Sequence, residues 1–68
     1  MSVGANIRRI REKKGLTQVY VADQAGISQV MLSQIENGYK DPSIRTGKRI
    51  ANILGCKLDD LVKEAITE

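Results

Sequence analysis

Residues 15–38, GLTQVYVADQAGISQVMLSQIENG, decide the fold because they contain two short helices separated by a tight turn. Thr17 is suited to cap the start of one helix, and Ser28 is suited to cap the start of the next. Between them, Gly26 accepts the positive φ angle that a sharp turn after a helix requires. Only about three residues separate the helices, and this spacing predicts a helix-turn-helix rather than an antiparallel helical hairpin.

Apolar residues recur at helical spacing within this stretch and predict which sides of the two helices are buried. The helix before the turn begins after Thr17, and the helix after it occupies about residues 28–36. Asn37 and Gly38 are suited to end the second of these helices, because both tolerate the left-handed conformation. The residues that we expect to be wholly or partly buried are Leu16, Val21, Ala22, Ala25, Ile27, Met31, Leu32 and Ile35.

The sequence on either side predicts three further helices and no strand, since no run alternates between polar and apolar residues. One helix ends near Lys14, one occupies about residues 43–54 with Ser43 as its cap, and one covers about residues 58–66. Inward residues outside the quoted stretch are expected to be Val3, Ile7, Ile10, Ile44, Ile50, Ala51, Ile53, Leu54, Leu58, Leu61, Val62 and Ala65. The fold class is therefore all-α, with one compact five-helix domain over residues 1–68.

The composition excludes most catalytic and metal-binding chemistry. The chain has 68 residues, no His and a single Cys, so it lacks an imidazole base, a disulfide and the ligands of a zinc site. We expect Cys56 to be a core residue, and we expect no catalytic residue, metal, cofactor or small-molecule ligand. No apolar run approaches the roughly 20 residues that span a bilayer, so we expect a cytoplasmic protein without a membrane partner.

The net charge is +3, and its distribution is more informative than its size. Lys and Arg outnumber Asp and Glu in residues 1–56, whereas acidic residues outnumber basic ones in residues 57–68. A basic body with an acidic tail is expected if the body meets a polyanion such as a nucleic acid. The alternative is a solvated basic face without a partner.

Four short motifs connect these features to a known family. They are Leu16-Thr17-Gln18, Gly26-Ile27-Ser28, Ile35-Glu36-Asn37-Gly38 and Leu54-Gly55. In this order and spacing they resemble the lambda-repressor-like helix-turn-helix family, which is the Cro/C1 or Xre group of bacterial and phage transcription regulators. The resemblance covers about residues 4–62 and implies that the second helix crosses the DNA backbone while the third lies in the major groove.

The chain departs from the family pattern at a few positions. Gly47 and Lys48 stand where relatives usually have apolar residues, and Val19 and Tyr20 stand where polar residues are common. A glycine within a helix costs about 1 kcal/mol relative to alanine, so Gly47 either admits close packing or weakens its helix. An exposed aromatic ring at Tyr20 would have a role that the sequence does not identify.

Outward positions near the start of the third helix are the candidates for contacting bases. These positions are Gln29, Val30, Ser33 and Gln34. A glutamine amide offers a donor and an acceptor that match the major-groove edge of adenine, and a valine matches a thymine methyl. The resemblance implies that both glutamines and the valine read bases, with the serine as a fourth candidate. The alternative is that the glutamines are merely solvated.

The resemblance also implies residues that bind phosphates. Free N–H groups and the helix dipole at the start of the second helix favour an anion there. The candidate phosphate-binding residues are Thr17, Gln18, Ser28, Asn37, Tyr39 and Lys40. Arg11 and Glu36 resemble the family's ion pair between the first and third helices, and Arg45 is a candidate for minor-groove or dimer contacts.

These features predict a sequence-specific transcription regulator, a repressor, that binds double-stranded operator DNA. Family members usually pair through their fourth and fifth helices, so the resemblance implies a homodimer on a pseudo-palindromic operator. Val62, Ala65 and Ile66 are candidates for the seam of that dimer. The alternative is an antitoxin or another protein-interaction module, for which Val19, Tyr20 and the last eight residues are the available surface.

Overall fold

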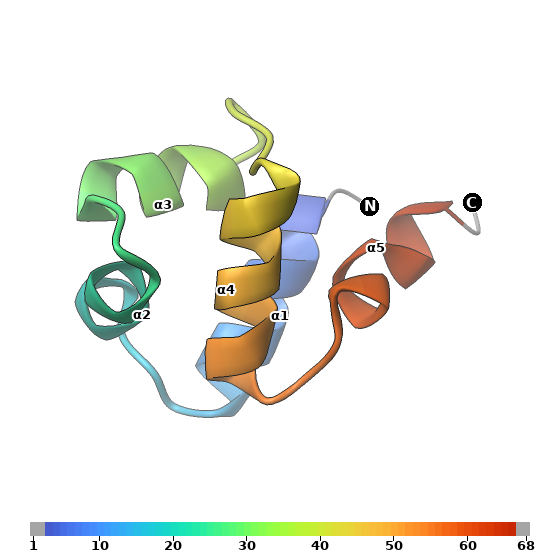
Figure 1. Ribbon diagram of the computed structural model, residues 1–68, viewed down its shortest axis with the longest axis horizontal. Helices are drawn as coiled ribbons and strands as arrows, with labels where there is room; N and C mark the ends of the chain where they lie inside the picture. Colours follow the sequence, from blue (N-terminus) through green and yellow to red (C-terminus); the bar gives the residue numbers. More distant parts are fainter. Residues whose placement is uncertain (1–2, 67–68) are drawn as a thin grey trace.

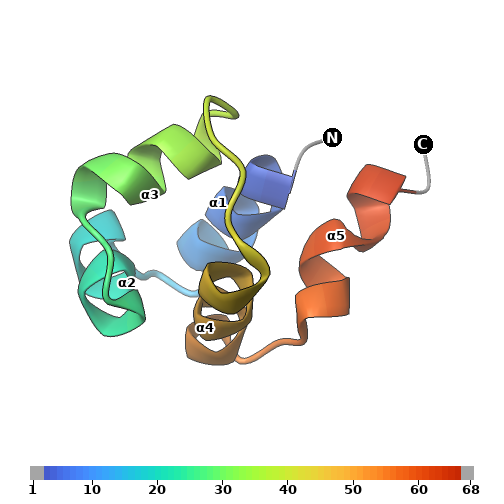
Figure 2. The same ribbon diagram turned by 45° about the horizontal axis from the view of Figure 1, so that its top comes forward.

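The computed structural model describes the backbone of residues 3–66 and the side chains of residues 3–62, and within those bounds it contains five helices and no strand. The helices are α1 (Val3–Lys13), α2 (Gln18–Ala25), α3 (Gln29–Glu36), α4 (Ile44–Leu54) and α5 (Leu58–Ile66). Figure 1 shows α1 and α4 in the middle of the molecule, with α2 and α3 on one side and α5 on the other. Figure 2 shows the same arrangement from a second angle. The predicted all-α, five-helix fold is confirmed.

Hydroxyl side chains cap three of the helices, as the sequence predicts. Thr17 Oγ1 accepts a hydrogen bond from Tyr20 N at 3.0 Å, and Ser28 Oγ accepts one from Met31 N at 3.0 Å. Ser43 Oγ caps α4 in the same way. Because such caps satisfy backbone N–H groups that lack a partner within the helix, they fix where α2, α3 and α4 begin.

Gly26 makes the turn between α2 and α3 possible. It has a φ of 73°, in the left-handed region, and it ends α2 as its C-cap. Ile27 and Ser28 complete the connection, so only three residues lie between the end of α2 and the start of α3. After α3, Gly38 has a φ of 81° whereas Asn37 stays at −90°, so only the glycine adopts the left-handed conformation.

The core lies between all five helices. Its fully buried apolar residues are Ile7, Val21, Ala22, Ala25, Leu32, Ile35, Ile50, Ala51, Leu54 and Leu61, each of them predicted. Cys56, which was expected in the core, is only partly buried and packs against the core from its edge. Burial, together with the nearby Asp60 carboxylate, raises the pKa of the Cys56 thiol.

The prediction for Ile44 is wrong, because this side chain is 72% exposed instead of facing inward. Ile44 is the first residue of α4 and borders a groove of about 170 Å³ together with Val3, Leu58 and Val62. The apolar stripe of a helix indicates a direction, but it does not say where along the helix the core ends. The side chains of Ala65 and Ile66, two of the three candidates for the dimer seam, lie outside the described residues.

Two buried glycines allow helices to approach each other closely. A Cβ on Gly4 would lie well inside contact distance of the Ile35 carbonyl oxygen, so α1 meets the backbone of α3 there. A Cβ on Gly47 would lie 3.0 Å from Leu58 Cδ1. Of the two roles considered for Gly47, the structure therefore supports close packing of α4 against α5.

A hydrogen bond from the Asn6 side chain links α1 to α5. This side chain is fully buried, and its Nδ2 donates a hydrogen bond to the Leu61 carbonyl oxygen at 2.7 Å. A buried amide outside any apolar pattern gives no signal in the sequence, and this contact was not predicted. None of the helices in the described part of the chain has the length and apolar character needed to cross a membrane.

Candidate nucleic-acid interface

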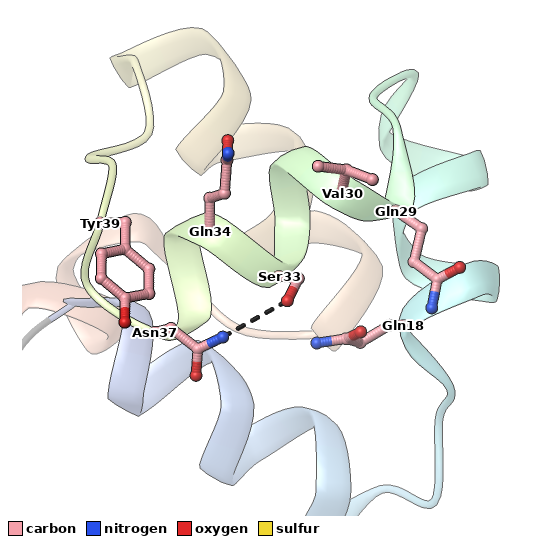
Figure 3. Close-up of a pocket in the computed structure, with 7 residues that line it drawn as sticks. All are labelled: Gln18, Gln29, Val30, Ser33, Gln34, Asn37 and Tyr39. Atoms are coloured by element: carbon pink, nitrogen blue, oxygen red, sulfur yellow. Dashed lines mark hydrogen bonds between the residues drawn. The ribbon is translucent and has the colours of Figure 1, made fainter.

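The outward side of α3 and the start of α2 border an open hollow of about 450 Å³. Its lining residues are Gln18, Gln29, Val30, Ser33, Gln34, Asn37 and Tyr39 (Figure 3). The hollow therefore brings together all four candidate base-reading residues with three of the candidate phosphate-binding residues. The other three candidates for phosphate binding, Thr17, Ser28 and Lys40, do not line it.

The candidate base-reading residues differ in how they are held. Gln29, Val30 and Gln34 are exposed, and Val30 is 67% exposed although it is apolar. Among the described residues, neither glutamine side chain forms a hydrogen bond. Ser33 is partly buried, and its Oγ accepts a hydrogen bond from Asn37 Nδ2 at 3.3 Å. Exposure alone is equally expected of solvated side chains, so the shared hollow is the feature that favours base contacts.

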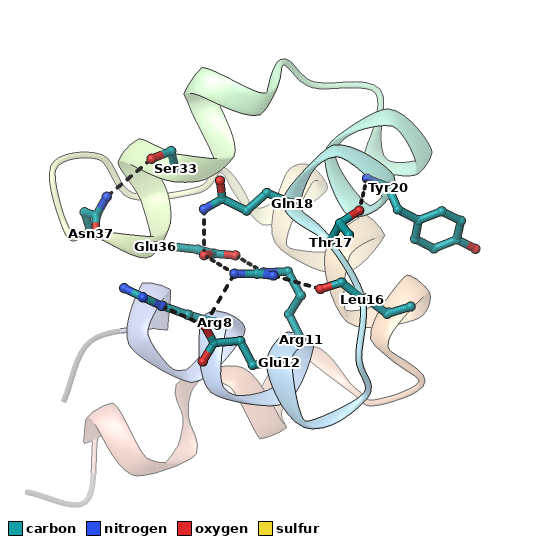
Figure 4. Close-up of polar contacts among 10 residues, drawn as sticks. All are labelled: Arg8, Arg11, Glu12, Leu16, Thr17, Gln18, Tyr20, Ser33, Glu36 and Asn37. Atoms are coloured by element: carbon teal, nitrogen blue, oxygen red, sulfur yellow. Dashed lines mark hydrogen bonds and ion pairs between the residues drawn. The ribbon is translucent and has the colours of Figure 1, made fainter.

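Gln18 is held differently from the glutamines of α3. It is the first residue of α2, it is partly buried, and its side chain points toward α3 (Figure 4). Its Nε2 donates a hydrogen bond to Glu36 Oε1 at 3.0 Å. The sequence placed Gln18 at an anion-binding helix start but gave no indication of this link, because the two residues are 18 positions apart.

Arg11 and Glu36 form the ion pair that the family resemblance implied. Arg11 Nε donates to Glu36 Oε2 at 2.7 Å and Arg11 Nη2 donates to Glu36 Oε1 at 3.1 Å, so the pair is bidentate. Both residues are buried, at 8% and 5% exposure. The hydrogen bond to Glu36 raises the pKa of Arg11, outweighing the opposite effect of burial. Arg11 Nη1 also donates to the Leu16 carbonyl oxygen at 2.8 Å, which fixes the segment between α1 and α2.

The remaining candidates lie at helix ends and in the loop after α3. The hydroxyl oxygens of Thr17 and Ser28 accept the capping bonds, which leaves each O–H group available to donate to a phosphate. Tyr39 and Lys40 are exposed in the loop that follows α3, and Tyr39 is 84% exposed. Arg45 is exposed in the first turn of α4.

Other basic residues are not part of this surface. Lys13 and Lys14 lie close to Gly55, at the end of α4 that is remote from α3 (Figure 1). Arg8 pairs with Glu12 at 3.2 Å, and the side chains of both are more than half exposed. These three basic side chains therefore lie outside the hollow.

Comparison with known proteins identifies the family. The model described as helix-turn-helix, HTH_3, matches residues 7–61. The chain is 42% identical over 60 residues to an uncharacterized HTH-type transcriptional regulator of Sinorhizobium fredii, covering 88% of this chain and 78% of that protein. It is 38% identical over 64 residues to the immunity repressor protein of Bacillus phage phi105, covering 94% of this chain but only 44% of the repressor.

A solved structure agrees with this assignment. The crystal structure of the P22 c2 repressor protein in complex with a synthetic operator superposes with a TM-score of 0.84 at 28% identity. The match covers 90% of this chain and 92% of that one. Family model, relatives and fold agree with the resemblance seen in the sequence, and the chain belongs to the helix-turn-helix family HTH_3.

Proposed function

We propose that this chain is a sequence-specific transcription regulator that binds double-stranded DNA and acts as a repressor in the cytoplasm. The observation that carries the proposal is the hollow along α3, where exposed amides and an exposed valine surround one concave surface. Two similar proteins support it: the phi105 relative is an immunity repressor, and the structure of the P22 c2 repressor was solved in complex with a synthetic operator. In this proposal α3 enters the major groove.

Base recognition follows from the chemistry of the outward side chains. The Gln29 and Gln34 amides can each donate and accept, which matches the N6 and N7 groups of adenine. Val30 can contact only an apolar group, and the thymine methyl is the apolar group that the major groove presents. Ser33, with its hydroxyl proton available, is a fourth contact at the centre of the helix.

Phosphate contacts surround these base contacts. The start of α2 presents unpaired N–H groups and the positive end of a helix dipole, and Gln18 stands at that position. Tyr39 and Lys40 follow α3 and are exposed, so they can reach the backbone on the other side of the groove. Thr17, Ser28 and Asn37 complete the proposed set of phosphate-binding residues.

A homodimer is part of the proposal, because one domain offers few base contacts. Ile44 is exposed beside an apolar groove formed with Val3, Leu58 and Val62, and a second copy would cover this surface. Arg45, next to Ile44, would then lie at the seam. A two-fold dimer reads two half-sites that are about one helical turn apart on a pseudo-palindrome.

Selection of bound duplexes from a random pool, combined with sedimentation, tests this function. We expect a site with two-fold symmetry and a complex of two chains per duplex. In that site, Gln34→Ala relaxes the sequence preference at one base pair. Lys40→Ala instead lowers the binding affinity for all sequences equally and makes the dependence of affinity on salt shallower. A pool that yields no enriched sequence would show that the proposed function is wrong.

A second function, that of an antitoxin or partner-binding module, is supported by the outer side of α2. Val19 and Tyr20 are 58% and 48% exposed, and neither lines the hollow beside α3. A stable one-to-one complex with another protein that survives nuclease treatment and is lost in Tyr20→Ser would favour this alternative. Unchanged operator binding by the same variant would show that the two surfaces are separate.

A further inference from the structure

The carboxylate of Glu36 joins three helices. Glu36 is the last residue of α3, and its side chain is 1% exposed. One oxygen, Oε2, accepts from Arg11 of α1, and the other, Oε1, accepts both from Arg11 and from Gln18 of α2. Figure 4 shows the three side chains meeting at this point.

An ionised carboxylate can only accept hydrogen bonds, and this fixes how the Gln18 amide is turned. The NH₂ group must face Glu36, so the carbonyl oxygen Oε1 must point elsewhere. The second hydrogen of the NH₂ group remains outside the bond to Glu36. Gln18 also lines the hollow, so its orientation determines which of its polar atoms a bound phosphate meets.

We propose that Glu36 is a positioning residue for DNA binding: it orients Gln18 before DNA arrives, and Arg11 orients Glu36. This inference rests on the proposed function and assigns the buried ion pair a role beyond joining α1 to α3. Arg11 alone occupies both carboxylate oxygens, so the ion pair is complete without the third hydrogen bond. Fixing a flexible side chain in advance removes part of the entropy cost that binding would otherwise include.

The substitution Glu36→Gln removes the charged acceptor of Gln18 with almost no change of shape. Arg11 has only donors and contacts both carboxylate oxygens, so the single oxygen of the new amide satisfies only one of its two bonds. If that oxygen takes the place of Oε2, the new NH₂ group faces Gln18, whose amide must turn round; if it takes the place of Oε1, Gln18 keeps only a neutral acceptor. In both arrangements the variant removes the ion pair and loosens the orientation of Gln18.

A double-mutant cycle between Glu36→Gln and Gln18→Ala separates positioning from simple loss of stability. Affinity for the selected operator is measured at a temperature where every variant is folded. We expect each single substitution to weaken binding about three- to tenfold, as for the loss of one hydrogen bond. In the Gln18→Ala background, Glu36→Gln should change affinity less than about twofold, since its effect passes through Gln18. Equal effects of Glu36→Gln in both backgrounds would overturn the proposal.

Asn6→Ala is the matched control for stability. It removes another buried polar contact of α1, the hydrogen bond to the Leu61 carbonyl oxygen, and this bond involves neither Gln18 nor α3. We expect it to lower the unfolding midpoint while leaving operator affinity unchanged. An equal loss of affinity in Asn6→Ala would show that any weakening of α1 impairs binding, which would contradict a specific role for Glu36.

A measurement on the unaltered chain tests the orientation even if Glu36→Gln does not fold. Relaxation of the side-chain ¹⁵N amide groups should show Gln18 to be more rigid than Gln29 and Gln34, which form no side-chain hydrogen bond within the described residues. Equal mobility of the three amides would overturn the proposal. Failure of the unaltered chain to bind any selected duplex would refute the proposed function, whereas binding with an additive cycle would refute only the positioning role.

Discussion

The two sides of α3 differ in what holds their residues. On the inner side, Leu32, Ile35 and Glu36 are buried, and the Glu36 carboxylate accepts three hydrogen bonds. On the outer side, Gln29 and Gln34 are exposed, and their side chains form no hydrogen bond with any described residue. The difference indicates that one side sets where the helix lies and the other is available for a ligand. Substitutions on the inner side should therefore change stability, with Glu36 also acting on affinity through Gln18, and those on the outer side should change affinity alone.

Gly4→Ala should have the largest effect on stability, because it disrupts the contact between α1 and the C-terminal end of α3. The added methyl would clash with the Ile35 carbonyl oxygen, and a backbone atom cannot move aside as a side chain can. We expect the free energy of unfolding to fall by about 4 kcal/mol, at the upper end of single substitutions. Urea denaturation measures it. Gly15→Ala is the control: it has open space and a φ of 71°, so the loss should be only about 1 kcal/mol.

Arg11→Met should come next, since it leaves the buried Glu36 carboxylate without its cation. We expect a loss of about 3 kcal/mol in the free energy of unfolding. The ordinary pKa of an arginine lies well above pH 10, and in the folded chain the hydrogen bond to Glu36 raises the pKa of Arg11 further. The guanidinium is therefore charged in both folded and unfolded chains between pH 7 and pH 10. The loss should therefore be the same at both pH values, and a loss that shrinks toward pH 10 would contradict this account.

Arg8→Met is the control for that substitution. Arg8 also pairs with a glutamate, but the side chains of Arg8 and Glu12 are 54% and 56% exposed. Exposed ion pairs contribute between about 0 and 1 kcal/mol, so this variant should unfold almost like the unaltered chain. Similar losses for Arg8→Met and Arg11→Met would mean that burial does not distinguish the two pairs.

Gln29→Ala tests the outer side directly. We expect affinity for the selected operator to fall by about 2 kcal/mol and preference to relax at one base pair. Stability should change by less than about 0.5 kcal/mol, as is usual for exposed positions. Gln24→Ala, at an exposed position of α2 outside the hollow, should alter neither quantity. A large loss of stability in Gln29→Ala would remove the distinction between the two sides of α3.

The smallest predicted effect concerns Val30 and one methyl group of the DNA. Replacing the contacted thymine by uracil should weaken binding about fourfold, because one buried methyl group contributes about 0.8 kcal/mol. In Val30→Ala the same base change should have little effect. Fluorescence anisotropy on the two duplexes measures both values, and an unchanged uracil effect in Val30→Ala would assign the methyl contact to another residue.

Much of this fold follows from local patterns, whereas its helix contacts do not. Thr17, Ser28 and Gly26 predict the limits of α2 and α3 because capping and positive φ angles depend on residues close in sequence. Leu32 and Ile35 are predicted to be buried from helical spacing. The same spacing predicts that Ile44 faces inward, but this side chain is exposed. Helical spacing gives no information about how far the neighbouring helices extend and therefore about where the core ends.

The candidate site also combines features that the local sequence predicts with contacts that it does not. The outward residues of α3 follow once its inward residues are known, and the Arg11–Glu36 pair was implied by a resemblance rather than by spacing. The close approach at Gly4, the buried amide of Asn6 and the bond from Gln18 to Glu36 each join residues distant in sequence. A single sequence contains no information about which distant residues meet, so these contacts appear only in three dimensions.

The three-residue turn with Gly26 at its start has a consequence for engineering. This turn is too short to let α3 change its orientation relative to α2. The orientation of α3 is therefore set by its buried residues and does not depend on Gln29, Val30 or Gln34. Under the proposed function, exchanging these outward positions together should change the preferred operator while the scaffold stays unchanged. A small library varied at these positions alone should then yield regulators that share one framework and differ only in the DNA sites they bind.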